Sequence, residues 1–144
     1  MKILRGTSII EILIATAMIG LVILSAMSLI NRSQSQNTYA RNLSEATKYA
    51  TQAADWVRQQ RDILGWTTLA SKDVGPYCLT NLPTDFNSLP TPGACDSSDY
   101  LANIFFRQIT LDTSTPNVLK VTITVSWSEQ VPRETSIEME LTPW

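Results

Sequence analysis

The sequence predicts an α+β fold, in which the second half of one long N-terminal helix packs against a C-terminal antiparallel sheet of three or four strands. Three observations predict it. Residues 9–30 are apolar except for one carboxylate, residues 31–64 contain no Pro or Gly, and apolar residues recur at every second position beyond residue 104. Residues 67–103 are rich in Pro, Gly and small polar residues, so we expect loop there with at most short helical turns.

The apolar stretch Ile9–Ile30 contains Glu11 as its only charged residue. A helix of this length rises roughly 33 Å, which matches the hydrocarbon core of a bilayer. A carboxylate among apolar residues in a membrane is costly unless a partner pairs with it. We therefore expect Glu11 to have a partner, and we interpret that partner as a new α-amine made when the chain is cut just before Thr7.

The stretch Arg5–Ala15 resembles the N-terminus of type IV pilins and of the related pseudopilins of type II secretion. In that family a membrane aspartic peptidase removes a short basic leader ending in Gly, the new N-terminus is methylated, and a Glu lies five residues into the mature chain. The resemblance implies a leader at residues 1–6, cleavage and N-methylation at Gly6 and Thr7, and an assembly charge at Glu11. The first mature residue is usually Phe, and Thr7 in its place is more typical of minor subunits.

The resemblance also implies partners and a location. The partners would be other pilin subunits in a homo- or heteropolymeric filament, a prepilin peptidase, an inner-membrane assembly platform and membrane lipid. The protein would cross the bacterial inner membrane once, with its C-terminal head outside, and would lie on the cell surface after assembly. A cleaved signal peptide and a plain membrane anchor are the alternatives. A signal peptide has a shorter apolar core followed by a small-residue cleavage site, and a plain anchor has no need of Glu11.

Composition and charge argue against several classes of function. The chain has 144 residues and a formal net charge of −2, and removing Lys2 and Arg5 with the leader leaves −4, which is unlike a dedicated nucleic-acid binder. There is no His, so a His-based triad or zinc site is excluded. No nucleophile with a base, metal cluster or phosphate loop is recognisable. We therefore expect neither enzymatic activity, nor a cofactor, nor a metal site, nor binding of nucleic acid.

The pattern of residues 31–64 predicts that the helix continues as an amphipathic helix into the C-terminal globular part, which we call the head. Its apolar residues recur at steps of three and four, which places them on one helical face: Tyr39, Leu43, Ala46, Ala50, Ala53 and Val57. A coiled coil is the alternative interpretation of this face, although small residues make a weak zipper core. We expect the helix to end near Leu64 with Gly65 in a left-handed cap, and Arg58 and Arg61 to be solvated or packed on the head.

The head is predicted over residues 65–144. The two cysteines, Cys78 and Cys95, lie outside the membrane and predict one disulfide across the loop rather than a metal site. Three aspartates of this region suggest calcium, but their spacing favours solvated turns: Asp85, Asp96 and Asp99.

A β-meander is predicted over residues 104–142. Its strands are expected at Ile104–Asp112, Leu119–Trp127 and Thr135–Leu141, with connections at Thr113–Asn117 and Ser128–Arg133. The apolar face of the sheet needs a cover, which the apolar face of the helix can provide, and Trp127 is expected in this core rather than in a ligand site.

The resemblance implies that the chain is a structural subunit of a type IV pilus, of the minor pilin kind. Two alternatives stay open. A type II secretion pseudopilin would have the same N-terminus and would push exoproteins outward. A membrane-anchored binding module would use its sheet to recognise a ligand and would not polymerise.

Overall fold

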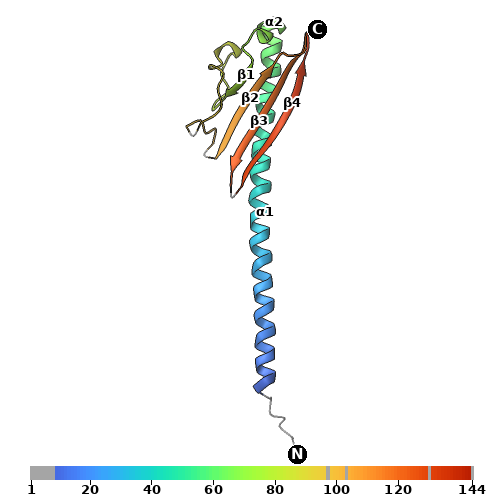
Figure 1. Ribbon diagram of the computed structural model, residues 1–144, viewed down its shortest axis with the longest axis vertical. Helices are drawn as coiled ribbons and strands as arrows, with labels where there is room; N and C mark the ends of the chain where they lie inside the picture. The colour runs from blue at the N-terminus through green and yellow to red at the C-terminus, as the bar shows by residue number, and fades with distance from the viewer. Residues whose placement is uncertain (1–8, 97, 103, 130, 144) are drawn as a thin grey trace, which may run out of the picture. The chain divides into compact units, whose positions relative to one another are not determined.

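The computed structural model describes residues 9–96, 98–102, 104–129 and 131–143. One long N-terminal helix and a four-stranded antiparallel sheet confirm the predicted α+β class (Figure 1). The chain divides into two units, Met1–Arg41 and Asn42–Trp144. The elements in chain order are α1 (Ile9–Leu64), α2 (Trp66–Ala70), β1 (Gly75–Cys78), the 3-10 helix η1 (Phe86–Ser88), β2 (Phe105–Asp112), β3 (Leu119–Ser128) and β4 (Pro132–Leu141).

The sheet has the order β1-β2-β3-β4, with every neighbouring pair antiparallel. The C-terminal part of α1 lies behind the strands in Figure 1. Along β2 and β3 every second residue is buried, which is the period of a strand with one face on a core. The buried face of the sheet includes Trp127, which is 2% exposed, so its predicted place in the core is confirmed.

Alanines make up half of the buried residues of α1 in the described chain. Ala46, Ala50, Ala53 and Val57 are completely buried, as predicted. The predicted face was too long at its N-terminal end, because Tyr39 lies in the first unit and is 36% exposed.

The buried face of α1 is also wider than predicted. It includes four residues that the pattern of three- and four-residue steps left out: Asn42, Ala54, Trp56 and Gln60. Trp56 and Gln60 are buried because α1 packs against the loop before β2 as well as against the sheet, whereas Asn42 contacts Glu129 at the end of β3. Burial of two surfaces needs more than one narrow stripe of apolar residues.

Trp56 and Gln60 fasten the loop to α1. The indole Nε1 of Trp56 donates to the carbonyl oxygen of Pro83 at 2.9 Å, and its ring stacks on Phe86 with centroids 5.6 Å apart. Gln60 accepts from the backbone N–H of Phe86 at 2.9 Å and donates to the carbonyl of Thr84 at 3.3 Å. These bonds satisfy backbone groups that a loop would otherwise expose or leave unpaired.

The prediction that residues 67–103 contain only loop and helical turns was wrong. β1 lies within this segment and pairs with β2, so that Tyr77 is opposite Ile109. Gly75 and Pro76 were interpreted as breakers, but β1 is an edge strand, where a residue without an N–H donor is tolerated. The carbonyl of Pro76 on the open side accepts the N–H of Gly93 at 2.7 Å.

The disulfide predicted between Cys78 and Cys95 is formed. It joins the end of β1 to the part of the loop that approaches β2. The aspartates near it make turns of the predicted kind. Asp85 accepts the N–H of Asn87 and caps η1, and Asp96 accepts the N–H of Ser98, whose hydrogen bonds lower the pKa of the Asp96 carboxyl.

α1 ends at Leu64 as predicted, but the predicted conformation of Gly65 was wrong, and so was one predicted strand boundary. Gly65 has a positive φ of 79° but a ψ of 162°, so it is not in the left-handed helical region. Its N–H closes the last turn of α1 on the Arg61 carbonyl at 2.9 Å, and the chain then turns directly into α2. The predicted connection Ser128–Arg133 is shorter, because β4 begins at Pro132, which pairs with Ser128. A Pro at the first position of an edge strand removes no ladder bond that the sheet needs.

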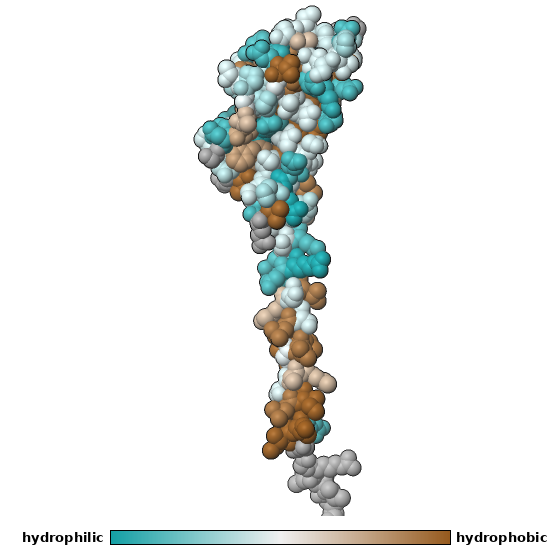
Figure 2. Space-filling view, viewed as in Figure 1, coloured by the Kyte–Doolittle hydropathy of each residue, from teal (hydrophilic) through white to brown (hydrophobic). Residues whose placement is uncertain are grey.

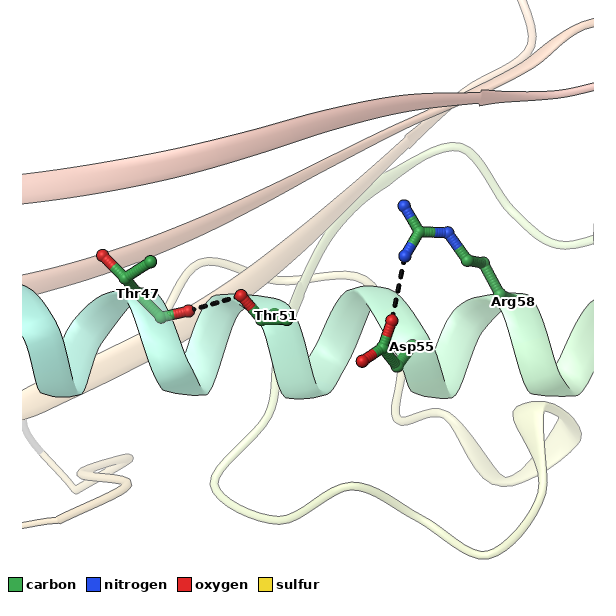
Figure 3. Close-up of polar contacts among 4 residues, drawn as sticks. All are labelled: Thr47, Thr51, Asp55 and Arg58. Atoms are coloured by element: carbon green, nitrogen blue, oxygen red, sulfur yellow. Dashed lines mark hydrogen bonds and ion pairs between the residues drawn. The ribbon is translucent and has the colours of Figure 1, made fainter.

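The solvent-facing side of α1 carries local polar contacts, shown in Figure 3. The hydroxyl of Thr51 donates to the carbonyl of Thr47 at 2.8 Å. Arg58 pairs with Asp55 at 2.9 Å, and both side chains are more than half exposed, so Arg58 is solvated as predicted. An exposed pair at this spacing contributes only a few tenths of a kcal/mol, about 0.3–0.5.

Glu129 connects the end of β3 to α1. Its carboxylate accepts the side-chain N–H of Asn42 at 2.6 Å and the indole N–H of Trp127 at 3.1 Å. Asn42 is the first residue of the second unit and is buried. One carboxylate oxygen therefore satisfies two buried donors where the helix and the sheet meet.

Arg107 is a cation on the buried face of β2, which explains the irregular pattern of that strand in the sequence. Its side chain is 2% exposed, between Phe105 and Ile109 along the strand and opposite Val125. Its Nε donates to no acceptor within the described residues. Burial lowers the pKa of the guanidinium, and nearby Tyr49 opposes that change.

Replacing Arg107 by Met is expected to raise the free energy of unfolding by about 1–3 kcal/mol, because a buried charge without a full set of partners costs stability. A lowered pKa means that the folded chain binds this proton less tightly than the unfolded chain, so the cost is present at every pH below the folded pKa. The increase in the free energy of unfolding caused by Arg107→Met should therefore be constant between about pH 5 and 9, where arginine stays charged. Thermal unfolding of both variants across this range measures it, and a less stable Arg107→Met chain would contradict it.

Candidate functional site

The candidate site is the apolar part of α1 in the first unit. Glu11 lies in the first turn of the helix as the structure describes it. Gly6 and Thr7, the residues predicted for cleavage and methylation, lie outside the described residues. The structure therefore places the predicted assembly charge and the two cysteines, and it brings together only the cysteines.

The side chains of this part of α1 are unburied. An 18-residue window of the helix has a mean hydropathy of 2.5 and none of it is buried within the chain, so α1 is long and apolar enough to cross a membrane. The large apolar side chains are 50–79% exposed, and they appear as the brown stretch of Figure 2. They are Ile9, Ile10, Ile12, Leu13, Ile14, Met18, Ile19, Leu21, Val22, Ile23, Leu24, Met27, Leu29 and Ile30.

Such a surface needs lipid or other apolar helices around it. Exposed patches beyond a few hundred Å² mark interaction or membrane surfaces in soluble domains. Here the apolar residues surround the helix instead of forming one stripe, which is the pattern of a helix covered on all sides.

Two polar side chains within the apolar stretch bond to their own helix. The hydroxyl of Thr16 donates to the carbonyls of Ile12 and Leu13, both at 3.0 Å, and that of Ser25 donates to Leu21 at 2.8 Å. A hydroxyl satisfied in this way can enter a nonpolar environment without a separate partner.

Glu11 differs from these hydroxyls. Across residues 9–96, 98–102, 104–129 and 131–143, no hydrogen bond or ion pair to its carboxylate is found, and its side chain is exposed. The next charged residue along the chain is Arg32, beyond the apolar stretch. A carboxylate in this position can pair with a cation supplied by another molecule, which would remove most of the cost of placing it in an apolar surrounding.

The residues from Asn31 to Arg41 are polar or charged with few exceptions and are exposed throughout. They form the teal band of Figure 2 beyond the brown stretch. This change of composition marks where an apolar environment would end and water would begin.

A second surface was missed by the sequence analysis. On the face of the sheet opposite to α1, two adjoining hollows of about 350 and 260 Å³ share Phe106, Ser126 and Glu134. The signal was present in the sequence, since Phe106 occupies a solvent-facing position of a strand whose other such positions are polar. The strand was predicted, but the alternation was used only to assign its buried face.

Within the described residues no group of three or more His, Cys, Asp or Glu side chains is arranged to hold a metal ion. Comparisons with protein-family models, with curated proteins and with solved structures find no match. What defines the class of this protein is therefore its own architecture, an α+β head whose N-terminal helix is long and apolar enough to span a membrane.

Proposed function

We propose that the chain is a minor pilin-like subunit of a type IV pilus, made as a single-pass protein of the bacterial inner membrane with its head outside. A prepilin peptidase would cut after Gly6, and the new chain would begin at a methylated Thr7. The apolar part of α1 would hold the subunit in the membrane before assembly and would bundle with the helices of other subunits in the filament.

The observation that carries this proposal is the carboxylate of Glu11, which has no partner among the described residues and lies at the start of a helix whose apolar side chains are exposed. In a bundle of such helices, the Thr7 ammonium of one subunit would supply the missing cation to Glu11 of a neighbour. The Coulomb attraction between two opposite charges is much stronger in an apolar bundle than in water. It would therefore favour one register of neighbouring helices as well as their association.

N-terminal sequencing of the protein from its native host tests the proposal. We expect the mature chain to begin at Thr7 with a methylated amine. Gly6→Ser should block processing and leave the gel band at the mass of the uncut chain. The matched control is Gly20→Ser, at a glycine where an added Cβ meets no atom within 4 Å, and it should be processed normally.

A mature chain that retains Met1 would overturn the proposal and favour an anchored domain that does not polymerise. Deleting the gene and scoring both pili and secreted proteins separates the two filament classes. Loss of pili with normal secretion supports the pilus subunit. Loss of secretion with normal pili supports the pseudopilin instead.

A further inference from the structure

The side chains on the solvent-facing side of the sheet form cross-strand rows. Two of these rows lie side by side. One consists of Phe106, Ser126 and Glu134, and the next of Gln108, Thr124 and Ser136. In both rows the middle strand supplies a small hydroxyl residue. In the first row, this small residue of β3 lies between larger residues of β2 and β4. The small residues of β3 therefore form the floor of the hollows, and the larger residues of β2 and β4 form their walls.

The wall on β2 is aromatic. Tyr100 packs on Phe106 with ring centroids 4.4 Å apart, and Tyr100 is 42% exposed. Cys95 lines the same hollow, and its disulfide to Cys78 holds this part of the loop against the sheet. Phe106 is an exception on the solvent-facing side of β2, β3 and β4, which otherwise carries polar and charged residues, and Tyr100 from the loop before β2 enlarges its aromatic surface.

The wall on β4 is Glu134, which lies in the same cross-strand row as Phe106. Two strand spacings separate the walls, roughly 10 Å. The hollows also contain Ser128, Thr124 and the amide of Gln108. Among the described residues, the charged side chains that line the hollows are one acid and one base, Glu134 and Arg133, which together carry no net charge.

We infer that these hollows form one groove that binds a neutral oligosaccharide. An aromatic wall offers a flat apolar surface to the C–H face of a sugar ring. Hydroxyl, amide and carboxylate groups on the floor and opposite wall can exchange hydrogen bonds with the sugar hydroxyls. Nucleic acid fits less well, because phosphate binding needs several cationic side chains and this groove has one, next to a carboxylate.

The groove is formed by the second unit alone, so sugar binding does not depend on polymerisation. Binding is measured on the unassembled full-length chain in lauryldimethylamine oxide micelles, since maltoside or glucoside detergents would compete. The probes are lactose, maltotriose and chitotriose, titrated to tens of millimolar while amide resonances are recorded. A 12-nucleotide single-stranded DNA is the comparison probe.

We expect saturable shifts from at least one of the three saccharides at the amides of Phe106, Thr124, Ser126 and Glu134. Phe106→Leu keeps an apolar side chain but removes the ring, and should weaken binding about tenfold. Thr124→Val should weaken binding by several-fold. Its matched control is Thr122→Val, which lies on the same strand and face but outside the groove, and should bind like the unaltered chain.

Any of four results would overturn the inference. The first three are no shift with any of the three saccharides, shifts confined to other parts of the head, and equal losses in Thr124→Val and Thr122→Val. Preferential binding of the oligonucleotide at the same amides would also overturn it. The unperturbed resonances of each variant report whether it is folded. Glu134→Gln provides a third groove variant, at an exposed residue outside the core.

Discussion

Under the proposed pilin function, replacing Glu11 by Ala is expected to lower incorporation of the chain into filaments about a hundredfold. The estimate rests on the loss of one partner from a charge pair in an apolar bundle, which costs roughly 3 kcal/mol or more because the other charge is left unpaired. Insertion into the membrane should be unaffected or slightly better, because a costly carboxylate has been removed. Immunoblots of sheared filaments and of inner membranes from the same cells measure both quantities.

Thr16→Ala is the matched control for Glu11→Ala. It also removes a polar group from the apolar stretch, but the Thr16 hydroxyl bonds to carbonyls of its own helix and has no need of a partner in another subunit. Its incorporation should equal that of the unaltered chain. Glu11→Asp keeps the charge on a shorter side chain and should give an intermediate result. Equal incorporation of Glu11→Ala and Thr16→Ala would refute the charge pair.

The sequence could predict the elements whose patterns are long and regular. The end of α1 at Leu64 follows from the glycine that comes next and the basic residues of the last two turns. The burial of Ala46 to Val57 on one helical face and the alternation of β3 up to Trp127 follow from residue periods. The disulfide followed from an even cysteine count in a loop that needs a staple. The helix and strand features are local in the sequence. The disulfide depends on one pairing, and a chain with two cysteines allows no other pairing within it.

The parts that the sequence could not predict depend on contacts between distant segments. β1 exists because β2 offers it an edge, although its own residues, Gly75 and Pro76, argue against a strand. The second buried row on α1 exists because the loop folds over Trp56 and Gln60. For the candidate site, Glu11 was found from its residue type and position. The groove around Phe106 required the register of three strands, which no single strand contains.

Breaking the disulfide is expected to lower the free energy of unfolding of the head by about 3 kcal/mol, which corresponds to a fall of roughly 10–20 °C in Tm. The bond closes the segment between Cys78 and Cys95 and so restricts the unfolded chain. The double variant Cys78→Ser/Cys95→Ser, compared with the oxidised chain by calorimetry in micelles, measures the effect. Reductant should destabilise the unaltered chain to the same extent and leave the double variant unchanged, and a Tm within about 2 °C of the oxidised chain would contradict the estimate.

The same variant shows whether the loop has two independent anchors. The N–H of Gly93 bonds to Pro76 on the side held by the disulfide, whereas the N–H of Phe86 bonds to the Gln60 side chain on α1. In Cys78→Ser/Cys95→Ser we therefore expect amide exchange to accelerate at Gly93 and to stay slow at Phe86. Gln60→Ala should give the reverse, fast exchange at Phe86 with Gly93 protected. If each variant accelerated both amides equally, the segment would open as one unit, and the helix and the disulfide would be parts of a single anchor.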